Sequence, residues 1–155
     1  MSRRLLILAL AALTSFARVG SIAAQELGTG DEARAMLDRA ISALKSDAPS
    51  ALSQFNDPSD RVFHDRDLYV FCFDVADGKI TADSNTGLRG MDIQSLKLKD
   101  DPIGQRAYDA VQNTPQGGVR TVDYNFPKPG TTEPAAKQFL EARVGNQGCG
   151  VAYFQ

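Results

Sequence analysis

The sequence predicts an α+β domain in which one antiparallel sheet of five strands carries helices on one face. Two helical patterns come first, over residues 31–55, and extended segments fill most of the remaining chain. Glycine- or proline-rich turns join several of these segments, as is typical of antiparallel strands. The 155 residues fit one domain, which we place at residues 25–155.

The first 24 residues read as a secretory signal peptide. Arg3 and Arg4 precede an apolar run over residues 5–13, and the small residues before Gln25 offer a cleavage site near Ala24. Polar residues interrupt the run long before the roughly 20 apolar residues that a membrane span needs. An uncleaved membrane anchor is the alternative. We expect a periplasmic or secreted protein.

Charge and composition exclude several classes of protein. The whole chain carries 17 basic and 19 acidic side chains, and loss of the signal peptide leaves 14 basic side chains and a net charge of −5. Such a chain lacks the basic stripe that nucleic-acid binding needs. An apolar share of 43% indicates a folded protein rather than a disordered one. We therefore expect no nucleic-acid partner.

Two helices are predicted before the sheet. The first begins at Asp31, and its buried face has helical spacing. Asp47 is placed to cap a second, short helix that has Pro49 in its first turn, and residues 56–60 form the turn that ends it. The apolar residues of the first helix are Ala33, Met36, Leu37, Ala40, Ile41 and Leu44.

The first strand is predicted over residues 68–73 and is apolar on both faces. Tyr69 and Phe71 alternate with Val70 and Cys72, so a central strand covered on both sides is indicated. The dipeptide at residues 77–78 is Asp-Gly, which predicts a tight turn into a second strand over residues 79–82.

The remaining elements are predicted from turn and cap signals. Residues 83–99 read as a loop with scattered apolar side chains, and Asp100 or Asp101 is expected to cap a helix that has Pro102 at its first position and ends near Asn113. Three further strands are predicted, over residues 118–126, 133–144 and 149–154.

Catalytic groups are sparse. His64 is the only histidine, so a metal site with several imidazoles is impossible, and its cluster with Asp65 and Asp67 is typical of a charged loop before a strand. A small hydrolase or redox protein that uses Cys72 or His64 stays open as a further hypothesis. We expect no catalysis, no metal and no cofactor.

Aromatic and cationic side chains on the strands indicate a ligand cavity instead. Tyr69, Tyr124 and Tyr153 lie on three strands, and Lys137 and Arg143 lie on a fourth. If they share the sheet face opposite the helices, phenols and cations would suit a small carboxylate. The alternative is that the tyrosines belong to the core and the cations lie at strand edges.

Cys72 and Cys149 are the only two cysteines, and they lie 77 positions apart. An exported protein permits a disulfide between them. Two buried thiols that act as small apolar side chains are the other possibility.

Five pieces of the sequence form a recognisable set in this order: residues 63–74, the "G-x-D" step at Gly90 and Asp92, residues 122–130, Lys137, and residues 149–153. In these pieces the chain resembles single Cache domains of the second type, which are extracytoplasmic PAS-like sensor modules. Together the five pieces cover roughly residues 31–155. Many members have Ala-His where this chain has Ala82-Asp83, and the tryptophans common in the family are missing here.

The resemblance implies a PAS-like strand order in which the first and last strands are neighbours, and this favours the cysteine bridge. It also implies a pocket for a short carboxylate or related metabolite. The ligand-binding residues that we expect are Tyr69, Phe71, Asp83, Tyr124, Lys137 and Tyr153.

The function expected from these observations is an exported, stand-alone Cache domain that binds a small organic acid as a sensory module. The chain stops directly after its last strand, so we expect it to act with a partner such as a membrane-bound receptor or kinase. The replacement of the family's histidine by Asp83 keeps an alternative open, in which the pocket is degenerate and the protein docks on that receptor through protein–protein contacts. The oligomeric state is not indicated.

Overall fold

The computed structural model describes residues 26–155. The predicted signal peptide and its cleavage point near Ala24 lie outside these residues. The elements run in the order helix, helix, three strands, a short 3-10 helix, helix and three strands. The predicted α+β class is confirmed.

The two N-terminal helices begin at side-chain caps. Helix α1 spans Gly30–Ser46, where Thr29 and Glu32 form a reciprocal capping box. Helix α2 spans Ala48–Phe55, and the side chain of Asp47 accepts a hydrogen bond from the backbone N–H of Ser50. The first helix therefore starts one residue before the predicted Asp31.

The sheet is antiparallel and has six strands instead of the predicted five. Its order is β1-β2-β6-β5-β4. Strand β3 pairs with Cys72 and Phe73 of β2, on the edge of β2 that faces away from β6. The additional strand, β1, has only two residues, too few for any alternation to show in the sequence. The strands are β1 (His64–Asp65), β2 (Leu68–Asp74), β3 (Ile80–Ala82), β4 (Val119–Pro127), β5 (Pro134–Val144) and β6 (Gln147–Phe154).

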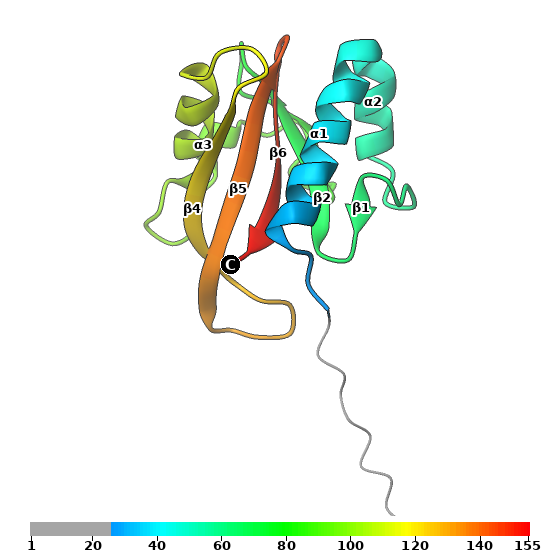
Figure 1. The fold of residues 1–155 in the computed structure, drawn as a ribbon. Coiled ribbons are helices and arrows are strands. Elements are labelled where there is room, and N and C mark those ends of the chain that lie inside the picture. Colours follow the sequence, from blue (N-terminus) through cyan, green and yellow to red (C-terminus); the bar gives the residue numbers. More distant parts are fainter. Residues whose placement is uncertain (1–25) are drawn as a thin grey trace, which may run out of the picture.

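The two N-terminal helices pack on one face of the sheet, as predicted, whereas the third helix lies on the other face, which differs from the expectation that all helices share one face. Figure 1 shows α1 and α2 on one side, and α3, which spans Ile103–Gln112, on the other beside β4. The 3-10 helix η1, Ile93–Ser95, contacts α3. Pro102 is the N-cap of α3 and provides no side-chain hydrogen bond, while Asp101 forms an ion pair with Arg106 at 2.9 Å. The predicted aspartate cap is therefore wrong.

Strand β2 divides its side chains between two cores. Leu68, Val70 and Cys72 contact the core under α1 and α2, whereas Phe71 and Phe73 contact a second core that includes side chains of η1 and α3. All five are at most 6% exposed. The sequence-based prediction of a strand covered on both faces is confirmed.

Cys72 and Cys149 form a disulfide across the centre of the sheet. They are directly opposite in the β2–β6 register, and their Cα atoms are 4.1 Å apart. No free cysteine remains in residues 26–155. The bridge that the family resemblance favoured is confirmed, and the alternative of two buried thiols is wrong.

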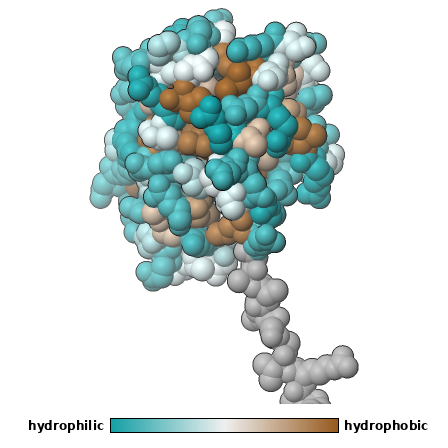
Figure 2. Space-filling model, viewed as in Figure 1, coloured by the Kyte–Doolittle hydropathy of each residue, from teal (hydrophilic) through white to brown (hydrophobic). Residues whose placement is uncertain are grey.

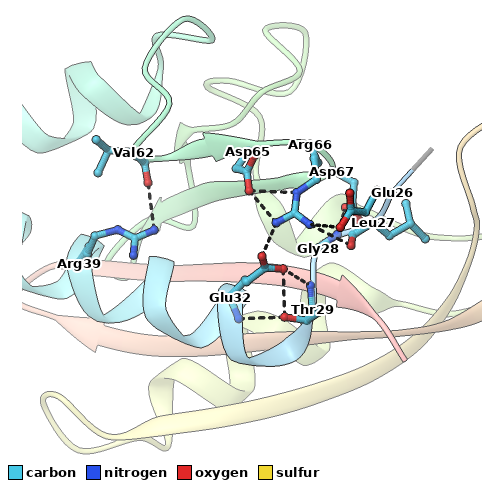
Figure 3. Close-up of polar contacts among 10 residues, drawn as sticks. All are labelled: Glu26, Leu27, Gly28, Thr29, Glu32, Arg39, Val62, Asp65, Arg66 and Asp67. Atoms are coloured by element: carbon cyan, nitrogen blue, oxygen red, sulfur yellow. Dashed lines mark hydrogen bonds and ion pairs between the residues drawn. The ribbon is translucent and has the colours of Figure 1, made fainter.

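Arg66 joins the beginning of α1 to the turn between β1 and β2 (Figure 3). Its guanidinium lies 2.6 Å from a carboxylate oxygen of Glu32 and 2.7 Å from one of Asp65, and it also donates to the carbonyl of Leu27. The hydrogen bond from Arg66 is the main reason why the pKa of Glu32 falls to about 2. Beside this cluster, the Asp67 carboxylate accepts from the backbone N–H of Gly28 at 2.7 Å. The first described residues are thus attached to the sheet.

The surface is mostly polar. Figure 2 shows apolar side chains in scattered groups among hydrophilic ones on the face in view. The large apolar residues exposed on the described surface are Val62, Met91 and Phe126. Within residues 26–155, no helix combines the length and apolar character needed to cross a bilayer.

Glu141 is an unpaired acid in the interior of the sheet. It lies opposite Gly150 of β6, it is 1% exposed, and neither carboxylate oxygen has a hydrogen-bond partner. Burial raises the pKa of this carboxyl well above 4.5, because the ionised form has lost its hydration. The folded protein therefore favours the neutral acid.

Removal of the disulfide should destabilise the domain. A cross-link over 77 residues restricts the unfolded chain, and on the loop-entropy model this contributes at most roughly 4.5 kcal/mol. We expect reductant to lower the urea midpoint of the wild-type protein and to leave that of the Cys72→Ala/Cys149→Ala variant unchanged. Equal midpoints for reduced and oxidised wild-type protein would contradict this account.

Glu141 should make the protein less stable as the pH rises. An acid whose pKa is raised on folding does not destabilise the protein at a pH below its unfolded pKa. Above that pH it lowers the free energy of unfolding, increasingly so until the pH reaches the folded pKa. Over that range the slope is about 1.4 kcal/mol per pH unit. We expect Glu141→Gln to flatten the loss of stability with rising pH that urea unfolding measures above the usual glutamate pKa of 4.5. Parallel stability profiles for the two proteins would show that Glu141 ionises freely.

Candidate functional site

A cavity of about 350 Å³ lies on the sheet face opposite α1 and α2. Strands β2, β4 and β5 form its floor, and the segment over residues 83–98 and helix α3 form its outer wall. Its polar lining consists of Tyr69, Asp83, Asn85, Lys97, Tyr124 and Lys137.

Strand register brings the floor residues together. Lys137 of β5 is directly opposite Tyr124 of β4 and Phe154 of β6. Phe139, two positions further along β5, has its ring 4.7 Å from that of Tyr124 and 4.8 Å from that of Phe71. Residues two apart on a strand share a face, so these aromatic rings form one continuous surface.

Glycines in β6 make room for the aromatic floor. Gly150 is opposite Phe71 and Gly148 is opposite Phe73 in the β2–β6 register. A Cβ atom added at Gly150 would lie 2.8 Å from the Phe71 ring, and one at Gly148 would lie 2.6 Å from the Phe73 ring. Larger residues at these positions would displace both rings, and with them the floor of the cavity.

The outer wall depends on a close contact between η1 and α3. A Cβ atom at Gly104 would lie 1.8 Å from the carbonyl oxygen of Ile93, so only glycine lets the two segments approach so closely. The backbone N–H of Gly104 also donates to the carbonyl of Leu96 at 3.1 Å. This contact holds apolar side chains of the 83–98 segment over the sheet.

Lys137 places a cation in a mostly apolar site. It is 8% exposed, and its ammonium forms neither a hydrogen bond nor an ion pair with the described residues. The nitrogen lies 4.4 Å from the Phe154 ring centroid and 5.5 Å from that of Phe126. Burial lowers the pKa of Lys137, and the nearby Asp67 carboxylate opposes this shift. The cation therefore lacks a close counter-charge.

Tyr69 and Tyr124 supply phenol groups to the same cavity. Burial is the main reason why the pKa of both hydroxyls is raised. A neighbouring group raises each pKa further: Asp83 acts on Tyr69, and Tyr69 acts on Tyr124. Both hydroxyls therefore stay protonated at neutral pH and can donate hydrogen bonds.

Asp83 lies directly after β3, at another part of the cavity wall. It is 5% exposed, and one carboxylate oxygen accepts from the backbone N–H of Asn85 at 2.7 Å. Burial raises its pKa, whereas the Asn85 hydrogen bond and the charges of Arg89 and His64 lower it. Arg89 donates to the backbone carbonyl of Asp83 and forms no ion pair with its carboxylate.

Five of the six residues expected at the ligand site line this cavity: Tyr69, Phe71, Asp83, Tyr124 and Lys137. Tyr153 does not. It is opposite Gln138 in the β5–β6 register, packs on the α1 side of the sheet, and donates to the side-chain oxygen of Gln138 at 2.8 Å. Arg143, the second candidate cation, lies on the cavity side of β5 but outside the lining.

Sequence reasoning missed the outer wall of the cavity. Leu88, Leu96 and Leu98 lie in a segment without helical or strand periodicity, so no pattern assigned them a face. The one available signal was their number, since a solvated loop rarely carries so many large apolar side chains.

The groups proposed for the hydrolase or redox hypothesis are engaged elsewhere. The Nε2 atom of His64 is 2.8 Å from the carbonyl oxygen of Phe55, and Cys72 is bonded to Cys149. In residues 26–155, no cluster of three or more histidine, cysteine or acidic side chains is placed to hold a metal ion.

Comparisons with known proteins identify the fold. No family model and no curated protein matches the chain. The solved structures that match it include three with 18% identity over 80% of this chain: a periplasmic sensor domain of a chemotaxis protein (88% of that chain, TM-score 0.56), a methyl-accepting chemotaxis protein from Vibrio parahaemolyticus (86%, 0.59), and a Cache chemosensory domain that recognises a carboxylic acid (86%, 0.54). This chain has the PAS-like α+β fold of the Cache sensor domains.

Proposed function

We propose that this protein is an exported sensory module that binds a small organic carboxylate in the cavity and does not transform it. The observation that carries the proposal is Lys137, a buried cation without a close counter-charge at the wall of an open cavity. An isolated buried charge is costly, and a bound carboxylate would compensate it with a charge-assisted hydrogen bond.

The rest of the cavity suits the same ligand class. The hydroxyls of Tyr69 and Tyr124 can donate to carboxylate oxygens, and the rings of Phe71 and Phe139 offer an apolar surface to a short carbon chain. The volume of about 350 Å³ lies at the lower end of the range for small-molecule sites.

An open cavity favours ligand binding over the docking alternative. A degenerate pocket would be expected to collapse and fill with side chains, since an empty apolar cavity costs stability. Here Gly148 and Gly150 keep β6 clear of the floor, and Gly104 keeps the outer wall in place. The retained space supports a binding site.

The proposal includes no chemical step. The cavity offers charge and hydrogen bonds, whereas the histidine and the cysteines are engaged outside it. Export rests on the signal peptide read from residues 1–24, and a sensory role rests on the shared fold of the chemotaxis domains. A receptor or kinase in the membrane is the partner that we propose for such a module.

Short carboxylates should stabilise the folded protein. A ligand at one hundred times its dissociation constant raises the free energy of unfolding by roughly 2.7 kcal/mol. We expect thermal-shift and titration calorimetry with C2–C4 carboxylates, both with and without an amino group, to find at least one such ligand. Lys137→Gln should weaken its binding roughly ten- to hundred-fold, because a charge-assisted hydrogen bond is lost. Tyr124→Phe should weaken it several-fold.

The matched control is Lys45→Gln, which removes the same charge from the exposed last turn of α1. It should bind as the wild-type protein does. The proposal fails if no carboxylate binds the folded protein, or if Lys137→Gln binds as tightly as Lys45→Gln.

A further inference from the structure

A buried acid and an arginine are neighbours on the cavity face of β5 without forming an ion pair. Glu141 is 1% exposed, and neither of its carboxylate oxygens has a hydrogen-bond partner in residues 26–155. The Nε atom of Arg143 is also buried without a partner there. Residues two apart on a strand share a face with Cα atoms roughly 7 Å apart, a distance that these two long side chains can span.

The Glu141 side chain leans across the sheet toward β6 rather than along β5 toward Arg143. Its Cγ atom lies 3.2 Å from the position that a Cβ atom at Gly150 would take. Gly148, which is opposite Arg143, is covered by α3, since a Cβ atom there would lie 2.8 Å from Val111 Cγ1. The last turn of α3 therefore packs on the surface where an ion pair between the two side chains would form.

The other charged groups around Glu141 are not placed to pair with it. Arg120 of β4 is directly opposite, but it is exposed at the edge of the sheet. On the same face of β2, β4 and β5, the other titratable side chains are Tyr69, Tyr124 and Lys137, which line the cavity, and β6 and η1 carry none there. The titratable residues of α3 have partners of their own: Arg106 with Asp101, Tyr108 with the carbonyl of Val75, and Asp109 with Gln105.

Helix α3, which contacts β4 and β5 on this face, depends on packing for its position. It has ten residues, and its N-cap, Pro102, provides no side-chain hydrogen bond. A helix this short is marginal in water without tertiary contacts. Side-chain hydrogen bonds attach it through Arg106 to the carbonyl of Asp123, and through Tyr108 and Gln112 to another carbonyl beyond β2. A disturbed contact with the sheet should therefore open α3 before the rest of the domain.

We propose that Glu141 and Arg143 form a pH-dependent switch that controls the packing of α3. While Glu141 keeps its proton it needs no partner charge, and α3 packs over it and completes the outer wall of the cavity. When Glu141 loses the proton to solvent, its carboxylate turns along β5 to Arg143, and the last turn of α3 leaves the sheet. The switch belongs to the fold and requires no ligand.

The direction of the switch follows from burial. Removal from water raises the pKa of Glu141 well above 4.5 in the packed state, because the ionised form has lost its hydration. In the released state the carboxylate meets water and Arg143, so its pKa is lower there. The packed state is therefore the form at low pH, and the released state gains population as the pH rises.

Native-state hydrogen exchange of the wild-type protein tests the switch. Amide protection factors, corrected for the intrinsic exchange rate at each pH, are compared between α3 and α1 from pH 4.5 upward. We expect α3 to exchange through a local opening, so its protection should be lower than that of α1 and depend less on urea. One linked proton allows this protection to fall by up to about ten-fold per pH unit.

Glu141→Gln assigns the acid. The amide has nearly the same size but cannot ionise, so we expect the protection of α3 to become independent of pH. The matched control is Glu133→Gln, which removes the same charge from an exposed position just before β5. It should keep the pH dependence of the wild-type protein.

Arg143→Gln assigns the partner. This change destabilises only the released state, so the loss of α3 protection should begin roughly half a pH unit higher, as expected for a solvent-accessible ion pair. Arg120→Gln removes the same charge from the position opposite Glu141 and should cause no such shift.

Each outcome decides for or against the switch. Protection of α3 that does not change with pH overturns it, and so does equal protection and urea dependence in α3 and α1, which would show global unfolding alone. A wild-type slope that survives in folded Glu141→Gln also overturns it. If Arg143→Gln causes no shift, or the same shift as Arg120→Gln, the proposed ion pair is wrong. The wild-type series and the arginine variants decide even if Glu141→Gln does not fold.

Discussion

The pairing of β2 with β6 is the constraint on which both halves of the domain depend. Its register places Cys72 opposite Cys149 on the face toward α1 and Phe71 opposite Gly150 on the face toward the cavity. A shift of one residue would exchange the faces of every side chain in the strand. The bulky rings would then lose the glycine that accommodates them, and the cysteines could no longer bond.

The disulfide therefore stabilises the floor of the cavity, although it lies on the other face of the sheet. It fixes the relative position of the two strands from which the floor is built, between two residues that adjoin Phe71 and Gly150 in sequence. A floor that is held before a ligand arrives lowers the entropy lost on binding. A sheet that is cross-linked in this way is well suited to a small ligand that makes few contacts.

The sequence predicted helices, caps and strands better than it predicted which face of the sheet a helix or a side chain occupies. Asp47 marked the start of α2, and the alternation around Phe71 marked a doubly covered strand, because caps and periodicity are local signals. The side taken by α3 was missed because an amphipathic helix shows only that one of its faces is buried, not against what. Tyr153 was assigned to the cavity because strand parity was unknown: Lys137 is opposite Phe154, so the neighbouring Tyr153 faces α1. The Arg66 ion pairs were also unforeseen, because they join segments far apart in the sequence.

Three buried ionisable groups lie near the cavity, and they differ in whether they line it. Glu141 shares the β5 face of Phe139, but it is 1% exposed and lies outside the cavity lining, and it avoids the cost of a buried charge by keeping its proton. Lys137 and Asp83 lie at the cavity wall, where an incoming molecule can supply the missing counter-charge. A ligand gains binding energy when it pairs with an unpaired charge that it can contact, whereas an acid closed off in the interior cannot contribute to binding. Access to the cavity, rather than burial alone, therefore distinguishes Lys137 and Asp83 from Glu141.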